Sequence, residues 1–178
     1  MSDAQFSLRD RMRLVAEIVR DAGGTIVGRT RLQKSVCLLS LAGFEDKFRF
    51  AYKHYGPFSE ALADSADLAG AFDVISEQRK ESSWGGTYSV YSVEGLKGED
   101  QGARGRLLHE AAKSDAILLE LAATAGYLFK EENCKEPWAK TARLKPDKSA
   151  DGRLGLAKDL YRRLREASED ALPEIGSA

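Results

Sequence analysis

The chain has little of what marks several functional classes. Of its 178 residues, only two are cysteine and two are histidine. Cys37 and Cys134 form no close-spaced pair, so the sequence suggests neither a zinc cage nor a disulfide framework. His54 and His109 lie far apart and lack partner ligands at metal-binding spacing. We therefore expect neither a metal nor a cofactor.

Long apolar runs and catalytic motifs are missing too. No run approaches the roughly 18 apolar residues that a membrane span needs. The first residues, MSDAQFSLRDRMRL, contain no apolar signal-peptide region, so we expect a cytoplasmic protein without membrane contact. There is no GxSxG motif and no P-loop, and Ser, Cys and His occur in no recognised nucleophile setting. The sequence thus predicts a protein that is not an enzyme.

Neither sign of charge is in clear excess. Lys and Arg number 27 against 28 Asp and Glu, which gives a net charge of -1. A nucleic-acid-binding surface would therefore have to be a local patch. Hydrophobic residues make up 43% and charged residues 31%, a composition typical of a folded globular protein and unlike that of a disordered chain.

Apolar periodicity predicts a mainly helical α+β fold. Ser7 is a candidate cap for the first helix, and Gly23-Gly24 a candidate stop. In the second helix, Leu32, Val36 and Leu39 share one stripe and should be buried. The expected helices cover residues 6–22, 29–42, 59–70, 107–129 and 152–167, with a short one starting near Pro137. The expected strands cover residues 48–55, 74–80 and 87–93, and residues 25–28 are expected to be either a connector or a single small strand.

The order of these elements is that of a winged helix. The loop at residues 81–86 contains two glycines and permits a hairpin between the last two strands. We expect a winged-helix-like module over residues 1–94 with a small β-hairpin. A linker at 95–105, rich in Gly and charge, should lead to a helical C-terminal part at 106–170 that packs on this module. The tail from residue 171 is expected to fray.

The stretch GRTRLQKSVCLL concentrates charge at the start of the second helix. Arg29, Arg31 and Lys34 could contact phosphates there, because backbone N–H groups and cations both favour anions. Solvated surface charge is an equally good interpretation. Gln33 could read an adenine edge from a major groove, although a helical glutamine is more often plain surface. Cys37 lies among apolar residues and should be a buried small side chain.

The predicted hairpin offers a second set of contact residues. Arg79 and Lys80 could serve as basic contacts of a wing. Trp84, in the hairpin loop, could stack on a base or on a partner, or fold back onto the sheet. The third helix carries Glu60, Asp64 and Asp67 in the place of a recognition helix, which argues against ordinary groove binding.

The segment Tyr55-Gly56-Pro57-Phe58 reads as a structural motif. Glycine followed by proline fixes a tight turn, and the flanking aromatic rings can be buried. A structural turn is a better interpretation than a ligand pocket.

Several of these motifs carry a family resemblance. The combination RTRLQK before an apolar helix, an aromatic strand ending in YGPFS, and a following acidic helix resembles the bacterial and archaeal YwgA-like family. More distantly, the LQK and YGP pair resembles Panacea or SocA-type antitoxin domains. LLELAATAGYLFKEE and KEPWAK extend the likeness through most of the chain. The resemblance implies a winged-helix-like module with a helical C-terminal part, and regulation of genes or of a partner protein.

Two functions remain open from the sequence. In the first, the protein regulates or takes part in defence by binding a partner protein, such as a toxin or nuclease, as an antitoxin does. In the second, it binds nucleic acid through a basic patch at the start of the second helix and a wing. Clustering of the basic residues on one face would separate the two. A homodimer is compatible with either.

Overall fold

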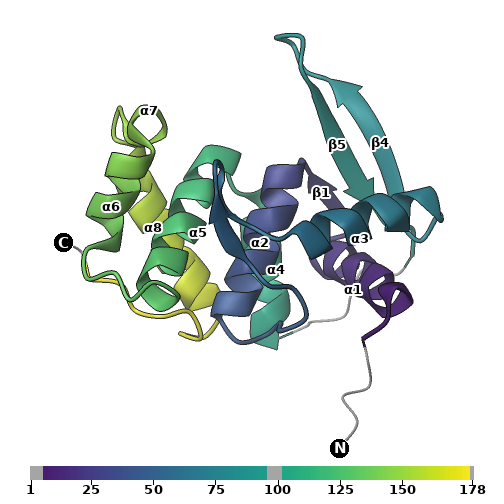
Figure 1. Ribbon diagram of the computed structural model, residues 1–178, viewed down its shortest axis with the longest axis horizontal. Coiled ribbons are helices and arrows are strands. Elements are labelled where there is room, and N and C mark those ends of the chain that lie inside the picture. The colour runs from purple at the N-terminus through teal and green to yellow at the C-terminus, as the bar shows by residue number, and fades with distance from the viewer. Residues whose placement is uncertain (1–5, 96–101, 177–178) are drawn as a thin grey trace, which may run out of the picture.

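The computed structural model describes residues 6–95 and 102–176. They form an α+β fold in which helices predominate, as the sequence predicted (Figure 1). The helices are α1 (Leu8–Asp21), α2 (Arg29–Leu41), α3 (Glu60–Ala71), α4 (Gly102–Lys113), α5 (Ala116–Lys130), α6 (Pro137–Leu144), α7 (Pro146–Ser149) and α8 (Arg153–Ala167). The strands are β1 (Thr25–Val27), β2 (Ala51–Lys53), β3 (Gly56–Phe58), β4 (Ser76–Glu81) and β5 (Thr87–Ser92).

The strands form two small antiparallel sheets. One has three strands in the order β1-β5-β4, and the other pairs β2 with β3. The predicted hairpin is confirmed, because β4 and β5 pair antiparallel from Ser76 opposite Ser92 to Glu81 opposite Thr87. Figure 1 shows this hairpin extending away from the helical body.

Helix α2 lies at the centre of the fold. It packs against α4, α5, β1 and β3. Leu32, Val36 and Leu39 are buried, as their shared stripe predicted. Burial extends beyond that stripe to Gln33 and Lys34, so α2 is enclosed nearly all round. The polar side chains of this helix therefore need partners inside the protein.

Local signals placed several helix boundaries correctly. Ser7 caps α1 in a reciprocal capping box with Asp10. Ser59 caps α3, because its hydroxyl accepts a hydrogen bond from the Leu62 amide at 3.3 Å. Pro137 begins α6, where its missing N–H has no helical acceptor to lose.

The expected single helix over residues 107–129 is wrong. The chain forms two helices instead, and Asp115 separates them. Its carboxylate accepts hydrogen bonds from the amides of Ile117 and Leu118, so it caps α5 and starts a new helix. Helix α4 begins at Gly102, so the end of the expected linker is helical. The rest of that linker, residues 96–101, lies outside the described residues.

The aromatic strand expected at 48–55 is also much shorter. Only Ala51–Lys53 is strand, because the Glu45 carboxylate accepts the Phe48 amide and holds the preceding segment in a turn. Gly56–Phe58, expected only to break this strand, forms the partner strand β3.

The C-terminal tail is more ordered than expected. Leu172 is buried, and the Pro173 carbonyl accepts a hydrogen bond from the Tyr161 hydroxyl at 2.8 Å. Residues 171–176 therefore pack on α8, and the prediction of a frayed tail is wrong there.

Replacement of Leu39 by alanine should test the central position of α2. Leu39 is fully buried, so Leu39→Ala should lower the free energy of unfolding by about 2–5 kcal/mol. Chemical denaturation followed by circular dichroism measures this change. Leu156 is 53% exposed on α8, so Leu156→Ala is the control and should change stability by less than about 0.5 kcal/mol. Equal effects of the two variants would contradict the burial of α2.

Candidate functional site

The two arginines at the start of α2 are engaged within the protein. Arg29 donates from Nη2 to Asp67 Oδ1 at 2.7 Å, which links α2 to α3. Arg31 donates to the Ser114 carbonyl at 2.8 Å and to the Val27 carbonyl at 2.9 Å. These bonds join α2 to β1 and to the junction of α4 and α5. The two arginines thus connect neighbouring elements.

Gln33 is buried and makes a two-way hydrogen bond. Its amide nitrogen donates to the Ser59 carbonyl at 3.0 Å, and its amide oxygen accepts from the Ser59 N–H at 2.9 Å. Only 4% of Gln33 is exposed. Since Ser59 is the N-cap of α3, this pair fixes the place where α3 begins. The structure gives Gln33 this internal contact in place of the surface position considered for it.

Lys34 is also inside the protein. Its ammonium donates to the Pro57 carbonyl at 2.7 Å, and only 1% of the residue is exposed. Burial lowers the pKa of Lys34 to about 8, because removal from water disfavours the charged form. Gln33 and Lys34 together attach the segment around β3 to the buried face of α2.

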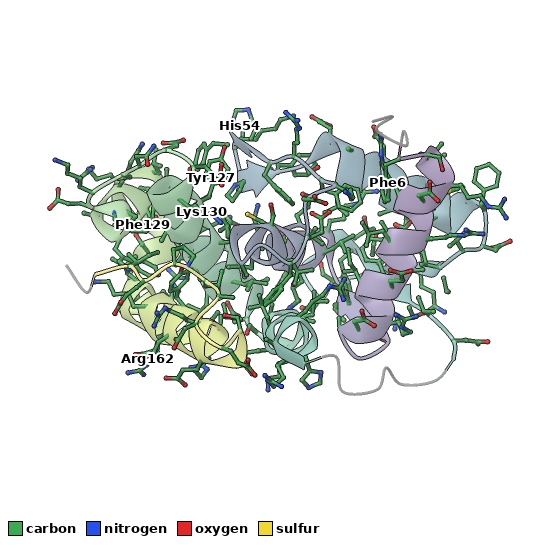
Figure 2. All side chains as sticks on the ribbon, turned by 90° about the horizontal axis from the view of Figure 1, so that it is seen from below. Phe6, His54, Tyr127, Phe129, Lys130 and Arg162 are labelled. Atoms are coloured by element: carbon green, nitrogen blue, oxygen red, sulfur yellow. The ribbon has the colours of Figure 1, made fainter. Side chains whose placement is uncertain are left out.

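The Tyr55–Phe58 segment turns tightly against α5. Gly56 has φ of +83°, and a Cβ there would lie 2.6 Å from Thr124 Oγ1. Only glycine fits such an approach without movement of its neighbour. Tyr55 is 69% exposed at the turn, and Figure 2 shows the neighbouring His54 at the outer edge of the molecule. The interior half of the segment thus packs, and its tip faces solvent.

The β4–β5 hairpin carries the remaining predicted contact residues on its exposed part. Arg79 and Lys80 are exposed and have no hydrogen-bonded or ion-paired partner among the described residues. Trp84 is 88% exposed in the loop, so it does not fold back onto the sheet. Ser82 and Gly86 hold this loop, because the Ser82 hydroxyl accepts the Gly86 amide at 3.0 Å. The indole is presented on a closed turn.

A groove between the start of α2 and the β4–β5 hairpin brings two predicted residues together. Arg29, from the start of α2, and Arg79, from β4, both line this open hollow of about 500 Å³. Its other lining residues are Gly28, Thr30, Thr87, Tyr88 and Ser89. The contact residues predicted from the sequence therefore divide into two groups. Arg29 and Arg79 line the same groove, while Gln33 and Lys34 are internal.

In the part of the chain that the structure describes, the side chains form no metal site, and no helix could span a membrane. Within residues 6–95 and 102–176, no three His, Cys, Asp or Glu side chains are grouped to hold a metal ion. Nor is any helix of those residues long and apolar enough to cross a bilayer. Cys37 is buried as predicted, and burial raises the pKa of its thiol to about 12, which makes it a poor nucleophile.

Sequence reasoning missed a buried ionic cluster. Glu120 of α5 is only 3% exposed, and its carboxylate accepts hydrogen bonds from Lys145 at 2.6 Å and Lys148 at 2.7 Å. A signal for it was present: Glu120 is the single charged residue in the apolar run AILLELAATAGYLF. A charge within such a run requires a buried partner. The two lysines come from the segment around α7, about 25 residues further along the chain.

Two glycines with similar backbone angles provide a test of the Gly56 contact. Gly56 and Gly85 have φ of +83° and +89°, but a Cβ at Gly85 meets no atom within 4 Å. Both alanine variants incur left-handed backbone strain, whereas only Gly56→Ala adds the clash with Thr124. Gly56→Ala should therefore destabilise the protein by about 1–3 kcal/mol more than Gly85→Ala. Thermal and urea unfolding measure the difference, and equal losses would contradict the close packing.

The depressed pKa of Lys34 predicts a pH dependence of stability. Between about pH 8 and the ordinary lysine pKa of 10.5, the unfolded chain holds a proton that the folded chain has lost. The free energy of unfolding should therefore rise with pH in this window, by at most about 1.4 kcal/mol per pH unit. The Lys34→Met variant lacks this group. The stability of the wild type relative to this variant should increase from pH 8 to 10 in urea titrations, and a constant difference would contradict a buried ammonium.

No protein family matches this chain, and neither does any curated protein or any solved structure. The likeness of the LQK and YGP segments to the YwgA-like family therefore stays a prediction. What can be argued about function rests on the arrangement of the side chains described above.

Proposed function

We propose that this chain is a non-enzymatic, winged-helix-like regulatory protein that acts by binding a partner protein. The β4–β5 hairpin is the wing and the main contact surface. The order α1-β1-α2-α3-β4-β5 and the strand order β1-β5-β4 support the winged-helix assignment. The β2–β3 pair, inserted between α2 and α3, is an addition to that plan.

The observation that carries the proposal is the exposure of Trp84. Tryptophan is among the residues most enriched in the energetic centres of protein interfaces. Here it is 88% exposed at the end of a hairpin that extends from the body (Figure 1). Tyr88 adds a second exposed aromatic ring on β5. An indole held in solvent on a closed turn contributes nothing to the core, so its role lies in contact with another molecule.

The distribution of charge favours a protein partner over a nucleic acid. Helix α3 occupies the place of a recognition helix, and Glu60, Asp64 and Asp67 on it are exposed. These acidic side chains weaken the attraction of α3 for phosphates, although Arg29 pairs with Asp67 and Lys53 pairs with Glu60. Lys34, which the sequence offered as a phosphate contact, is buried at 1% exposure. An antitoxin-like role, with a toxin or nuclease as the partner, fits the resemblance of the LQK and YGP segments.

A second candidate function rests on the groove between the start of α2 and the hairpin. Arg29 and Arg79 both line it, and Lys80 is exposed on the same strand as Arg79. A wing with these cations could follow the phosphate backbone of a duplex. In this alternative, Trp84 would stack on a base.

Binding measurements on a Trp84 variant test the main proposal. The full chain is combined with each protein encoded by the neighbouring genes, and complexes are detected by light scattering after size exclusion. Trp84→Ala should weaken the complex by about 30-fold or more, because a buried interface tryptophan typically contributes 2 kcal/mol or more. Leu144 is 45% exposed on α6, so Leu144→Ala is the matched control and should bind as the wild type does. Equal affinities of the wild type and Trp84→Ala would overturn the wing as the contact surface.

A duplex titration separates the two candidate functions. The wild type should show no salt-steep binding to random duplex DNA between about 50 and 200 mM salt. Salt-steep binding would overturn the preference for a protein partner. In that case, the Arg79→Ala, Lys80→Ala double variant should flatten the log-log salt slope by about 0.9 per lost phosphate contact. Arg29, Arg31 and Lys34 are left unchanged in this test, because all three bond within the protein.

A further inference from the structure

Three lysines and one glutamate converge beneath the Tyr55 turn. Glu120 accepts hydrogen bonds from Lys145 at 2.6 Å and from Lys148 at 2.7 Å. Its negative charge also acts to raise the pKa of the nearby Lys34. The lysines come from α2 and from the segment around α7, while Glu120 comes from α5. With all four groups ionised, this lysine cluster has two more positive than negative charges.

Two of the three lysines, together with Glu120, have little water around them. Lys34 is 1% exposed, and the side chains of Lys145 and Glu120 are each 4% exposed. Buried charges without a counter-ion are costly, and one carboxylate cannot neutralise three ammonium groups. Lys34 uses one of its three donors, on the Pro57 carbonyl, among the described residues. The cluster therefore retains both charge and donors for a further anion.

A second polar group in the same place also lacks a partner. Thr124 is one turn along α5 from Glu120, and its buried hydroxyl has no hydrogen-bond partner among the described residues. Its Oγ1 and the Lys145 ammonium both approach Gly56, at 2.6 Å and 3.6 Å from the position of a Cβ. The Thr124 hydroxyl and the lysines thus offer more hydrogen-bond donors than the protein has acceptors for, and an anion could accept from them.

One side of the cluster is open to solvent. The Lys148 side chain is 35% exposed, and its ammonium lies 5.4 Å from the centre of the Tyr55 ring. Tyr55 itself is 69% exposed. The exposed edge of the cluster is therefore the place where the Lys148 ammonium lies beside the Tyr55 ring.

We propose that the lysine cluster binds a phosphate-type anion, either inorganic phosphate or the phosphate of a small phosphomonoester, on the side next to Lys148 and Tyr55. A phosphate monoester carries a charge of about -1.5 to -2 at neutral pH, which matches the excess of the cluster. A carboxylate would neutralise only half of it. This site is remote in sequence from the wing and does not depend on the function proposed for Trp84.

The charges around Lys34 give the binding a pH dependence. The pKa of Lys34 is lowered to about 8, chiefly by burial; Glu120 and Cys37 act to raise it, and Lys145 and Lys148 to lower it further. Loss of this proton removes one of the two excess charges. Phosphate should therefore bind more weakly above this pKa than at pH 7.

Calorimetric titration of the full chain with inorganic phosphate tests the proposal, with chloride replacing phosphate at equal ionic strength in the reference. The wild type should bind phosphate at pH 7 and melt at a higher temperature in its presence. Lys148→Ala removes the exposed lysine of the cluster and should weaken binding at least 10-fold. Lys140 pairs with Glu132 at 2.7 Å outside the cluster, so Lys140→Ala is the matched control and should bind within twofold of the wild type.

Circular dichroism melting first establishes that both variants are folded. Absence of phosphate binding by the wild type would overturn the proposal. The proposal would also be overturned if Lys148→Ala bound phosphate as well as the wild type does. It would be overturned as well if Lys140→Ala lost as much affinity as Lys148→Ala, because phosphate would then bind to surface charge in general. Affinity for phosphate should fall several-fold at pH 9.5, and equal affinity at the two pH values would overturn the role of the excess charge. The phosphomonoester is distinguished by repeating the titration with glycerol phosphate.

Discussion

The fold depends on how the segment around β3 is attached to the buried side of α2. Lys34 donates to the Pro57 carbonyl, and Gln33 exchanges two hydrogen bonds with the backbone of Ser59. All of these groups are removed from water, so each bond replaces a hydration that the chain has lost. Loss of either side chain would leave backbone groups unpaired. The attachment therefore stabilises the fold at a point where several elements meet.

This attachment sets the position of the elements that follow it. Ser59 is both the partner of Gln33 and the cap of α3, so the same residue ends the β3 segment and starts the helix. Helix α3 then contacts α1 and leads into β4. The β4–β5 hairpin therefore follows a helix whose start is fixed by these hydrogen bonds. Its tip, with Trp84, is free to contact another molecule.

Two different surfaces emerge from one set of motifs. The charged start of α2, which in the sequence looks like a single basic patch, is divided between internal and exposed roles. Arg29 stays at the surface near the wing, whereas Lys34 joins an ionic cluster with Glu120 in the interior. In the proposed function, the β4–β5 hairpin contacts a macromolecule through its exposed aromatic residues, Trp84 and Tyr88. The lysine cluster, proposed as a site for a small anion, is charged, mostly enclosed and exposed at Lys148.

The sequence by itself determined the elements that local chemistry specifies. Ser7 and Ser59 marked helix starts because a side-chain cap acts within one turn, and the two glycines after Trp84 marked a hairpin. It also identified the apolar stripe of α2. Only the tertiary structure decided which polar residues of α2 are internal, since helical periodicity cannot distinguish a helix covered on one side from one covered on all sides. The pairing of Lys34 with Pro57, and of Glu120 with Lys145, joins residues 23 and 25 positions apart. Their partners are set by the folded arrangement, because packing of whole elements brings them together and no local pattern encodes it.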